Sequence, residues 1–408
     1  MKLIRLDEAL NKLANIKVPL HIEEVSLLQS LGRILAEDVI SDIELPPFDK
    51  SSRDGYAVKA KDTFTASELS PVKLRLKGHV KVGEIPTFSI SDGECAYIPT
   101  GAPIPEGSDA VVMIEDTAQE NEHVYIYKAV PPHNNIVRRG SDIPRGLCLL
   151  KRGTILNVKE ISLLAAIGRD KIKVYRALKA SIISTGPELI NVGQPLRGGK
   201  IYDINSHLIS SYLRRLGLQT YIVGIADDTV EDLQSKILQA LAKSDMIFIS
   251  GGTSKGEGDI LHQTLTQILH CKEGEIIFHG LALKPGKPTL VAIIDGKPIF
   301  GLPGNPTSAF TVLELLVKPW LLNTIFNTSI KELKLRARLA RKVVSFEGRR
   351  EIVYVKLLSS EDGFLAQPIL KGSESVTTFA EADGYIEISE DVNFIEENDI
   401  VEVKVLGI

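Results

Sequence analysis

The chain has 408 residues, of which 44% are hydrophobic and 25% are charged, and its net charge is −4. This length suggests roughly two to four domains, and the charge gives no global attraction to nucleic acid or to an anionic membrane. No run of about 18 apolar residues occurs, so no membrane span is expected. The three scattered cysteines exclude a disulfide framework and a paired-cysteine zinc site. We therefore expect a cytoplasmic protein that binds neither nucleic acid nor membrane, and in which any anion site is local.

The first part of the chain is predicted to be helical. Asp7 can cap a helix that runs through Leu13, and residues 22–35 carry apolar side chains at helical spacing. Two consecutive prolines at 46–47 end this pattern. A different kind of structure is therefore expected to follow.

The next segment, residues 48–140, is predicted to be rich in β-strands. Its apolar runs are short, and Gly and Pro turn signals recur between them. A helical pattern returns at residues 154–167 and ends at Gly168. This order suggests a helical segment that is interrupted by an inserted β domain and whose two pieces pack together.

Residues 178–325 alternate between strand and helix patterns. Amphipathic helices are predicted at about 205–216 and 230–242, each after a strand-like run. Pro306 fits the first position of the last helix. The alternation predicts a parallel sheet that is covered by helices on both faces.

The last segment, residues 326–408, returns to strand-like alternation and divides into two halves by charge. Residues 331–356 contain nine Lys and Arg against three Glu, whereas residues 357–408 contain twelve acidic residues against two Lys. The simpler interpretation is a β domain with two solvated faces. The alternative is that the basic half borders an anion site.

Three glycine-rich loops, at 250–259, 284–288 and 301–306, each follow an apolar run that is predicted to be a buried strand. Loops at the carboxyl ends of parallel strands share one edge of the sheet, where ligands bind. Glycine lets backbone N–H groups approach a ligand closely. Neither a Walker loop nor a dinucleotide-binding Gly pattern is present in them. The mixture of amides, hydroxyls, lysines and a carboxylate suits a large anionic ligand together with a divalent cation.

Charged residues in and near these loops supply candidate ligands. Lys284 and Lys287 flank a Pro-Gly pair, and two neighbouring cations are stabilised when an anion lies between them. Glu188, Asp228 and Asp259 each follow a predicted strand, and Mg²⁺ takes one or two carboxylates together with substrate phosphates. The alternatives are helix caps for the acids and solvated turns for the lysines.

Two hydrolase classes are excluded by their motifs. The histidines form neither an HxxxH nor an HxH pair, and no Gly-x-Ser-x-Gly sequence occurs. The Pro- and Gly-rich loop around Thr100 is interpreted by itself as a structural turn. The sequence therefore gives no support for a zinc or a serine hydrolase.

Eight motifs occur in the order that is found in the MoeA family of molybdopterin molybdenumtransferases, to which the chain is similar from near residue 5 to its end. The family also includes the C-terminal region of gephyrin and plant Cnx1. The motifs include an Asp-Gly-Tyr-Ala-Val sequence, a Tyr-Asp-Ile-Asn sequence and the three glycine-rich loops; they lie at residues 49–58, 100–102, 140–143, 184–189, 202–205, 250–259, 284–288 and 301–309.

The resemblance implies a multidomain α/β plus β fold with four parts. These are an elongated helical segment (1–47, continued by 141–176), an inserted β domain (48–140), a parallel, adenylyltransferase-like α/β domain (177–325) and a C-terminal β-barrel (326–408). It also implies a homodimeric enzyme with an active cleft shared between subunits. The enzyme would take adenylylated molybdopterin and molybdate, require Mg²⁺, insert molybdenum and release AMP, with the molybdopterin adenylyltransferase as a candidate partner.

By position, the resemblance implies roles for specific residues. The catalytic set would be Asp54, Thr100, Glu188, Asp228, Asp259, Lys284 and Lys287. The acids expected to bind the metal are Glu188, Asp228 and Asp259. The ligand-binding set would be Asp142, Ser250, Gly251, Gly252, Thr253, Ser254, Pro303, Asn305 and Ser308.

Two departures from the family pattern lie beside these residues. Arg53 stands where well-known members have Met, next to Asp54, and Pro187 replaces an acidic residue before Glu188. They leave the choice of metal oxyanion open, so a tungstate-inserting variant is one alternative. The others are a gephyrin-like scaffold protein and adenylylation of molybdopterin from ATP.

Overall fold

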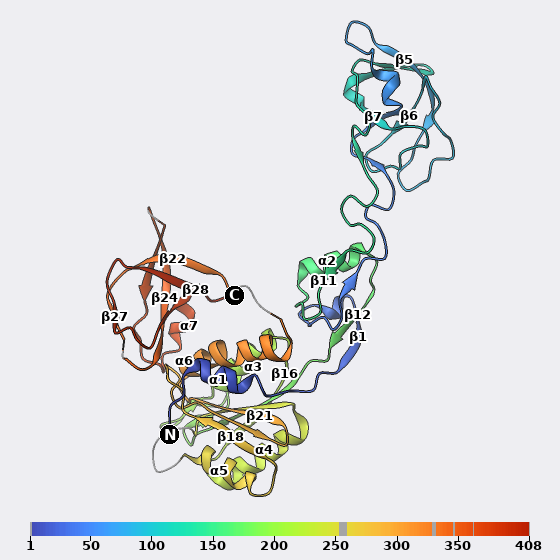
Figure 1. Cartoon of the computed structure of the whole chain (residues 1–408). Helices are drawn as coiled ribbons and strands as arrows, with labels where there is room; N and C mark the ends of the chain where they lie inside the picture. Colours follow the sequence, from blue (N-terminus) through green and yellow to red (C-terminus); the bar gives the residue numbers. More distant parts are fainter. Residues whose placement is uncertain (1, 253–258, 329–331, 346, 362, 408) are drawn as a thin grey trace.

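The computed structural model describes residues 2–252, 259–328, 332–345, 347–361 and 363–407. An elongated arm connects a two-part body to a small outer domain that lies well away from it (Figure 1). The body contains the α/β sheet and the barrel, and both ends of the chain lie there. None of the described helices is both long and apolar enough to cross a membrane.

The arm is held together by strand pairs, and this corrects the helix predicted at 22–35. That stretch forms strand β1 (Ile22–Ser26) and the short 3₁₀ helix η1 (Leu28–Ser30). β1 pairs with β12 (Lys171–Tyr175), and β2 (Val39–Ile40) pairs with β11 (Cys148–Leu150), both antiparallel. The two pieces of the arm therefore pack through strands, because partners far along the sequence override the local helical spacing.

The helices predicted at either end of these pieces do form. Helix α1 (Leu6–Leu13) begins after Arg5, so Asp7 lies in its first turn and is not its cap. Helix α2 (Val158–Ala166) starts with a capping box between Asn157 and Glu160, and it ends before Gly168, whose φ is 74°. α1 lies against the α/β part of the body, where its buried apolar residues join the main core.

The outer domain is β-rich, as predicted. Its six-stranded sheet has the order β7-β4-β6-β5-β9-β8. A two-stranded pair, β3 (Lys50–Ser51) with β10 (Ile136–Val137), lies between this sheet and the arm. The six strands are β4 (Gly55–Val58), β5 (Val72–His79), β6 (Glu94–Ile98), β7 (Ala110–Met113), β8 (Thr117–Glu120) and β9 (His123–Ile126).

The α/β part of the body is a six-stranded sheet with the order β16-β13-β17-β21-β20-β18. The first four strands in this order are parallel. Helices cover both faces, as predicted. The strands are β13 (Lys179–Thr185), β16 (Gln219–Ala226), β17 (Met246–Ser250), β18 (Gly274–His279), β20 (Leu290–Ile294) and β21 (Lys297–Leu302). The helices are α3 (Asn205–Arg215), α4 (Val230–Lys243), α5 (Ile260–Leu269), α6 (Pro306–Val312), η4 (Leu313–Val317) and η5 (Trp320–Ile325).

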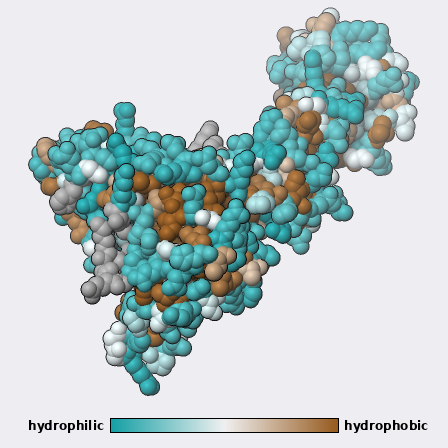
Figure 2. Space-filling model, turned by 60° about the horizontal axis from the view of Figure 1, so that its bottom comes forward, coloured by the Kyte–Doolittle hydropathy of each residue, from teal (hydrophilic) through white to brown (hydrophobic). Residues whose placement is uncertain are grey.

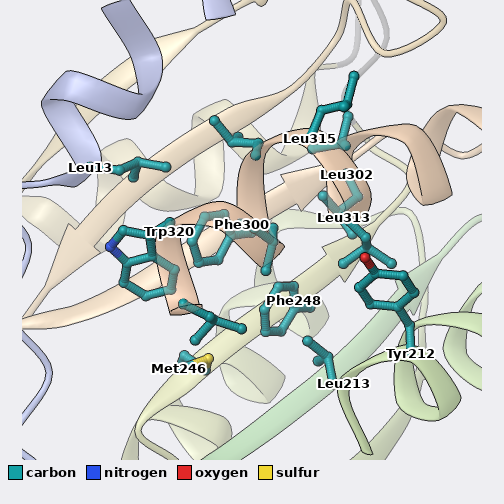
Figure 3. Close-up of a cluster of buried hydrophobic side chains, with 14 of the residues drawn as sticks. Leu13, Tyr212, Leu213, Met246, Phe248, Phe300, Leu302, Leu313, Leu315 and Trp320 are labelled. Carbon is teal, nitrogen blue, oxygen red and sulfur yellow. The ribbon is translucent and has the colours of Figure 1, made fainter. Parts of the chain in front are cut away.

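Alternate residues of the central strand β17 build two different cores. Met246 and Phe248 face the core shared with α3, α6, η4 and η5, whereas Ile247 and Ile249 face α4 and α5. Figure 3 shows Phe300 between Phe248 and Trp320, with ring centroids 5.1 and 5.2 Å apart. These fully buried contacts fix the central strands whose ends carry the predicted loops.

The sheet is mixed where a parallel one was predicted. β20 runs antiparallel between β21 and β18. β20 and β21 form a hairpin through Asp295 and Gly296, with φ angles of 49° and 73°. An Asp-Gly pair between apolar runs is a strong hairpin signal, and the sequence contained it.

The C-terminal part closes into a barrel, as expected. Its strand order is β24-β25-β22-β28-β26, and β26 pairs again with β24. The short helix α7 (Thr377–Glu381) and the pair β23 (Val343–Val344) with β27 (Phe394–Ile395) complete this part. The barrel strands are β22 (Lys334–Leu339), β24 (Arg350–Ser360), β25 (Gly363–Pro368), β26 (Gly384–Ile388) and β28 (Ile400–Val405).

Candidate active site

A cavity of about 1220 Å³ lies where the loop edge of the α/β sheet meets the barrel. Its walls include the ends of β13 and β17 and the loop that follows β21, three strands that are neighbours in the sheet, together with the Lys-Pro-Gly-Lys-Pro loop. The structure therefore brings the described part of all three predicted loops together. The sequence-predicted residues on the walls are Glu188, Asp228, Ser250, Gly251, Gly252, Lys284, Lys287, Pro303, Asn305 and Ser308.

One buried side chain, Asn205 at the start of α3, joins two of these loops. Its amide nitrogen donates to Oγ of Ser250 at 2.7 Å and to the carbonyl of Gly304 at 2.6 Å. The N–H of Gly251 donates to the carbonyl of Leu302 at 3.1 Å. We expected this N–H group to donate to a bound anion, but in the structure it joins the ends of β17 and β21.

Gly251 has no space for a side chain. Its φ is 94°, and a Cβ atom would lie 2.3 Å from the carbonyl oxygen of Thr185. This close approach lets the end of β17 pass directly beside the end of β13, so the requirement for glycine here is steric.

Two buried polar atoms on the cavity wall have no hydrogen-bond partner among the described residues. They are Oγ1 of Thr185 and Oδ1 of Asn205, whose side chains are otherwise enclosed. Buried polar atoms are normally paired, because an unpaired one costs free energy. A ligand in the cavity could satisfy both atoms.

The charged side chains on the described walls have both signs. Glu188 and Asp228 are exposed to the cavity, whereas Asp203 is buried and accepts from Oγ of Ser184 at 2.9 Å and from N of Ser206 at 3.0 Å. The basic members are Lys284, Lys287, Arg349 and Lys371, and the acidic ones are Glu188, Asp203, Asp228, Glu351 and Glu374. This balance suits an anion that is accompanied by a cation.

Lys284 is held at the junction of the two parts of the body. It lies on β19 (Leu283–Lys284), which pairs in parallel with β24 of the barrel. Its ammonium is 2.8 Å from Oε1 of Glu351. A predicted anion-binding lysine therefore has a carboxylate partner from the barrel.

Asp259 lies outside the described lining of the cavity. Its Oδ1 caps α5 by accepting from N of His262 at 3.0 Å, and its Oδ2 is 3.0 Å from Nε2 of His279. The His262 and His279 rings stack with centroids 5.2 Å apart. Both carboxylate oxygens are thus engaged within the protein. The expected ligand-binding residues Thr253 and Ser254 lie outside the described residues.

The remaining predicted residues lie on the outer domain and at its root, away from the cavity of the same chain (Figure 1). Oδ1 of Asp54 accepts from N and Oγ1 of Thr100 at 2.6 and 2.9 Å. The backbone N–H of Thr100, followed by its hydroxyl, lowers the pKa of the Asp54 carboxyl. Asp142 is exposed, and its N donates to the carbonyl of Leu45 at 3.0 Å, where the chain returns to the arm.

Family comparisons cover nearly the whole chain. Residues 4–168 match the MoeA N-terminal region (domains I and II), residues 181–323 match a probable molybdopterin binding domain, and residues 336–406 match the MoeA C-terminal region (domain IV). The chain is also 36% identical over 319 residues to a molybdopterin molybdenumtransferase of Staphylococcus aureus, which covers 78% of this chain and 74% of the relative.

The chain belongs to the MoeA family. A molybdopterin molybdenumtransferase of Haemophilus influenzae is 35% identical over 78% of the chain and 76% of its own length. A crystal structure of a molybdopterin biosynthesis MoeA protein from Pyrococcus horikoshii superposes with a TM-score of 0.83 at 43% identity, covering 99% of both chains. A second structure from that organism gives a TM-score of 0.85 at 29% identity, over 99% of this chain and 100% of the other.

In this MoeA family member, the barrel supplies cavity residues that the sequence reasoning did not name. They include Arg349, Tyr354, Lys371, Ser373 and Glu374. Nδ2 of Asn305 donates to Oγ of Ser373 at 2.6 Å, and this bond connects the loop after β21 to the barrel. The only sequence signal for this wall was the basic half of the last segment, which contains Arg349. Arg349, from that half, does line the cavity.

The donor set of the cavity suits a substrate-bound magnesium ion. Among the described residues, no group of three or more His, Cys, Asp or Glu side chains could hold a metal alone. Mg²⁺ is commonly bound by one or two carboxylates together with substrate phosphates and water. Glu188 and Asp228 offer two carboxylates on the wall of one cavity, and this is compatible with binding of that kind.

Proposed function

We propose that this protein inserts molybdenum from molybdate into adenylylated molybdopterin and releases AMP. The name of its relatives, molybdopterin molybdenumtransferase, suggests the reaction. The observation that carries the proposal is the shared cavity. Lys284, Lys287 and the end of β17 lie on the same walls as Glu188 and Asp228. A molybdate ion and a pyrophosphate-linked nucleotide both need cationic partners, and the phosphates of the nucleotide also need a divalent cation.

In this proposal, the chain acts mainly by positioning its substrates. Lys287 and Lys284 attract the oxyanions, while Glu188 and Asp228 would hold Mg²⁺ beside the pyrophosphate. The bound ion would neutralise charge on the departing adenylate. The paired loops around Asn205 keep these groups in fixed relative positions, and fixed dipoles and charges lower the barrier without a covalent protein intermediate.

The direct test is AMP release by purified protein supplied with adenylylated molybdopterin, molybdate and Mg²⁺. We expect release above a protein-free control, and its loss when the ion is chelated with EDTA. Lys287→Ala should weaken molybdate binding, because one cation of the cavity is removed. Lys334→Ala, which removes one cation from an exposed ion pair with Glu402 on the barrel, is the matched control. Absence of AMP release from the unaltered protein would refute the proposal.

We further propose that the enzyme is a homodimer in which each cavity is completed by the partner's outer domain. Asp54 directly precedes β4 and Thr100 follows β6, and both strands belong to the outer domain, which lies well away from the body that contains the cavity (Figure 1). Figure 2 shows hydrophobic patches on the body and also along the arm. Arm residues Leu28 and Val158 are 81% and 75% exposed, respectively. Apolar surface of this kind is typical of a subunit interface.

Mixed dimers test this arrangement. Asp54→Asn and Lys287→Ala chains, each of which we expect to have little activity alone, are co-expressed with different tags, and the dimer carrying both tags is purified. If the cavity is shared, one of its two sites has no altered residue, and about half of the normal activity returns. If Asp54 acts within its own chain, every site is damaged and the mixed dimer stays inactive.

The proposed setting is the cytoplasm, with adenylylated molybdopterin supplied by a molybdopterin adenylyltransferase. The three cysteines are free in the structure, and this is compatible with a reducing compartment. Capture of the purified adenylyltransferase by the immobilised protein, compared with the Lys287→Ala variant, measures whether the two enzymes associate directly.

A further inference from the structure

The segment that carries Lys284 is clamped between the beginning of the chain and the barrel. On one side, N of Ile4 donates to the carbonyl of Gly280 at 3.1 Å, and N of Ala282 donates to the carbonyl of Ile4 at 2.7 Å. On the other side, N of Arg350 donates to the carbonyl of Ala282 at 3.0 Å. The short strand β19 continues this pairing along β24. The backbone of residues 280–284 is therefore fixed by two distant parts of the chain.

The barrel also holds the Lys284 side chain. The strand register places Lys284 beside Glu351, and the ammonium is 2.8 Å from Oε1. Oε2 of the same carboxylate accepts from Oγ of Ser345 at 2.8 Å. The Glu351 side chain is only 11% exposed, whereas that of Lys284 is 38% exposed. A nearly buried carboxylate, which Ser345 anchors, thus restrains a more exposed ammonium at the cavity wall.

A carboxylate in a cavity for anions has two opposing effects. Its negative charge repels an incoming oxyanion and so weakens binding. Its contact with Lys284 restrains a flexible side chain that carries substantial rotamer entropy. If Glu351 only balanced the charge of Lys284, its side chain could be exposed to solvent and mobile. The buried anchoring by Ser345 favours a role in geometry.

We propose that Glu351 is a positioning residue, which holds the Lys284 ammonium in place for the anionic substrate and forms no bond to the substrate itself. The effect of this role on turnover depends on the proposed function. The contact between the two side chains can be tested without any turnover.

Chemical labelling of lysines gives the test that is independent of activity. Glu351→Gln removes the ion pair that holds the Lys284 ammonium, so this ammonium should be less restrained and more accessible to a reagent. Acetylation with a lysine-selective reagent, followed by mass spectrometry, should then be several-fold faster at Lys284 and nearly unchanged at Lys287. Glu402→Gln is the matched control, because Glu402 lies 2.8 Å from Lys334 and this variant should change only that lysine.

Turnover and binding separate positioning from simple charge balance. For Glu351→Gln we expect kcat to fall about tenfold, equivalent to about 1.4 kcal/mol, while the Kd for inorganic pyrophosphate stays the same or decreases. Glu351→Asp, which keeps the charge, should restore part of the rate. In a Lys284→Ala background the Glu351→Gln change should have no further effect on kcat, because the residue acts through the lysine.

Several outcomes would overturn the role of Glu351. Unchanged labelling of Lys284 would do so, and so would additive losses in the double variant. If Glu351→Gln fails to fold, Ser345→Ala keeps the carboxylate but removes its anchor, and Lys284 labelling should still increase. If the unaltered protein releases no AMP, the proposed reaction fails while the labelling result still decides whether Glu351 holds Lys284.

Discussion

Replacing Gly251 by alanine should destabilise the α/β part of the body far more than the same change at neighbouring glycines. The new methyl group would lie 2.3 Å from the backbone oxygen of Thr185, at a φ of 94°. Backbone strain at such a φ costs about 1–3 kcal/mol, and overpacking of a tight contact costs about 1–3 kcal/mol. Together these give a loss of about 4 kcal/mol for Gly251→Ala.

Two other glycines of the same loops provide graded controls. At Gly252 the φ is 66° and the nearest atom is a side-chain methyl of Thr185 at 3.0 Å, which must shift slightly, so we expect mainly the backbone strain of about 1–2 kcal/mol. At Gly304 the nearest atom is the Cα of Gly251 at 3.8 Å, an ordinary contact, so the change should stay within about 0.5 kcal/mol.

The chain has one tryptophan, Trp320, and it is buried against the central sheet (Figure 3). Its fluorescence therefore reports urea unfolding of this part of the molecule and is not obscured by the outer domain. We expect Gly304→Ala to be the most stable of the three variants, Gly252→Ala to be intermediate and Gly251→Ala to be the least stable. Equal unfolding midpoints for the first and last variants would refute the steric reasoning about the loop.

The other predictions concern the outer domain, helix α5 and the core. The Arg75 side chain, then the backbone N–H of Ser91 and the Lys77 side chain, lower the pKa of Glu94 from 4.5 to about 2. The stabilisation of the folded outer domain is complete above pH 4.5 and is lost as the pH falls through about 2. Cleavage of this domain by pepsin should therefore increase as the pH falls across that range, and less steeply in Glu94→Gln. Asp259→Ser should keep the cap of α5, whereas Asp259→Ala should lower the free energy of unfolding in urea by about 1 kcal/mol. Equal turnover of Asp259→Ser and the unaltered protein would show that the Asp259 carboxylate is not catalytic. Phe300→Ala should lower the unfolding free energy by about 3–5 kcal/mol, measured with the same fluorescence signal, because it opens a cavity between two aromatic rings.

The parts of the fold that could be predicted are those whose signals are local. The central strands and helices α3 and α4 were predicted from apolar runs, helical spacing and Gly stops, and Pro306 does lie at the start of α6. The loop cavity was also predictable, because the loops after β17 and β21 follow adjacent strands of one sheet. Chain topology brings the ends of neighbouring strands together whatever their separation in sequence.

The parts that could not be predicted depend on distant partners. β1 has helical spacing, but it pairs with β12, almost 150 residues later. The contact between Lys284 and Glu351 depends on a two-residue strand pairing across the body, for which no periodic pattern exists. The positions of Asp54 and Thr100 relative to the cavity follow from the extended arm, and helical or strand periodicity says nothing about the direction in which an arm points.

The clamp around residues 280–284 has a consequence for how the protein matures. Ile4 leaves the ribosome early, whereas β24 emerges only after residue 350 has been translated. Lys284 can reach its final position only when both Ile4 and β24 are available to pair with residues 280–284. Catalytic competence should therefore arise late in biosynthesis, after the central sheet has already formed.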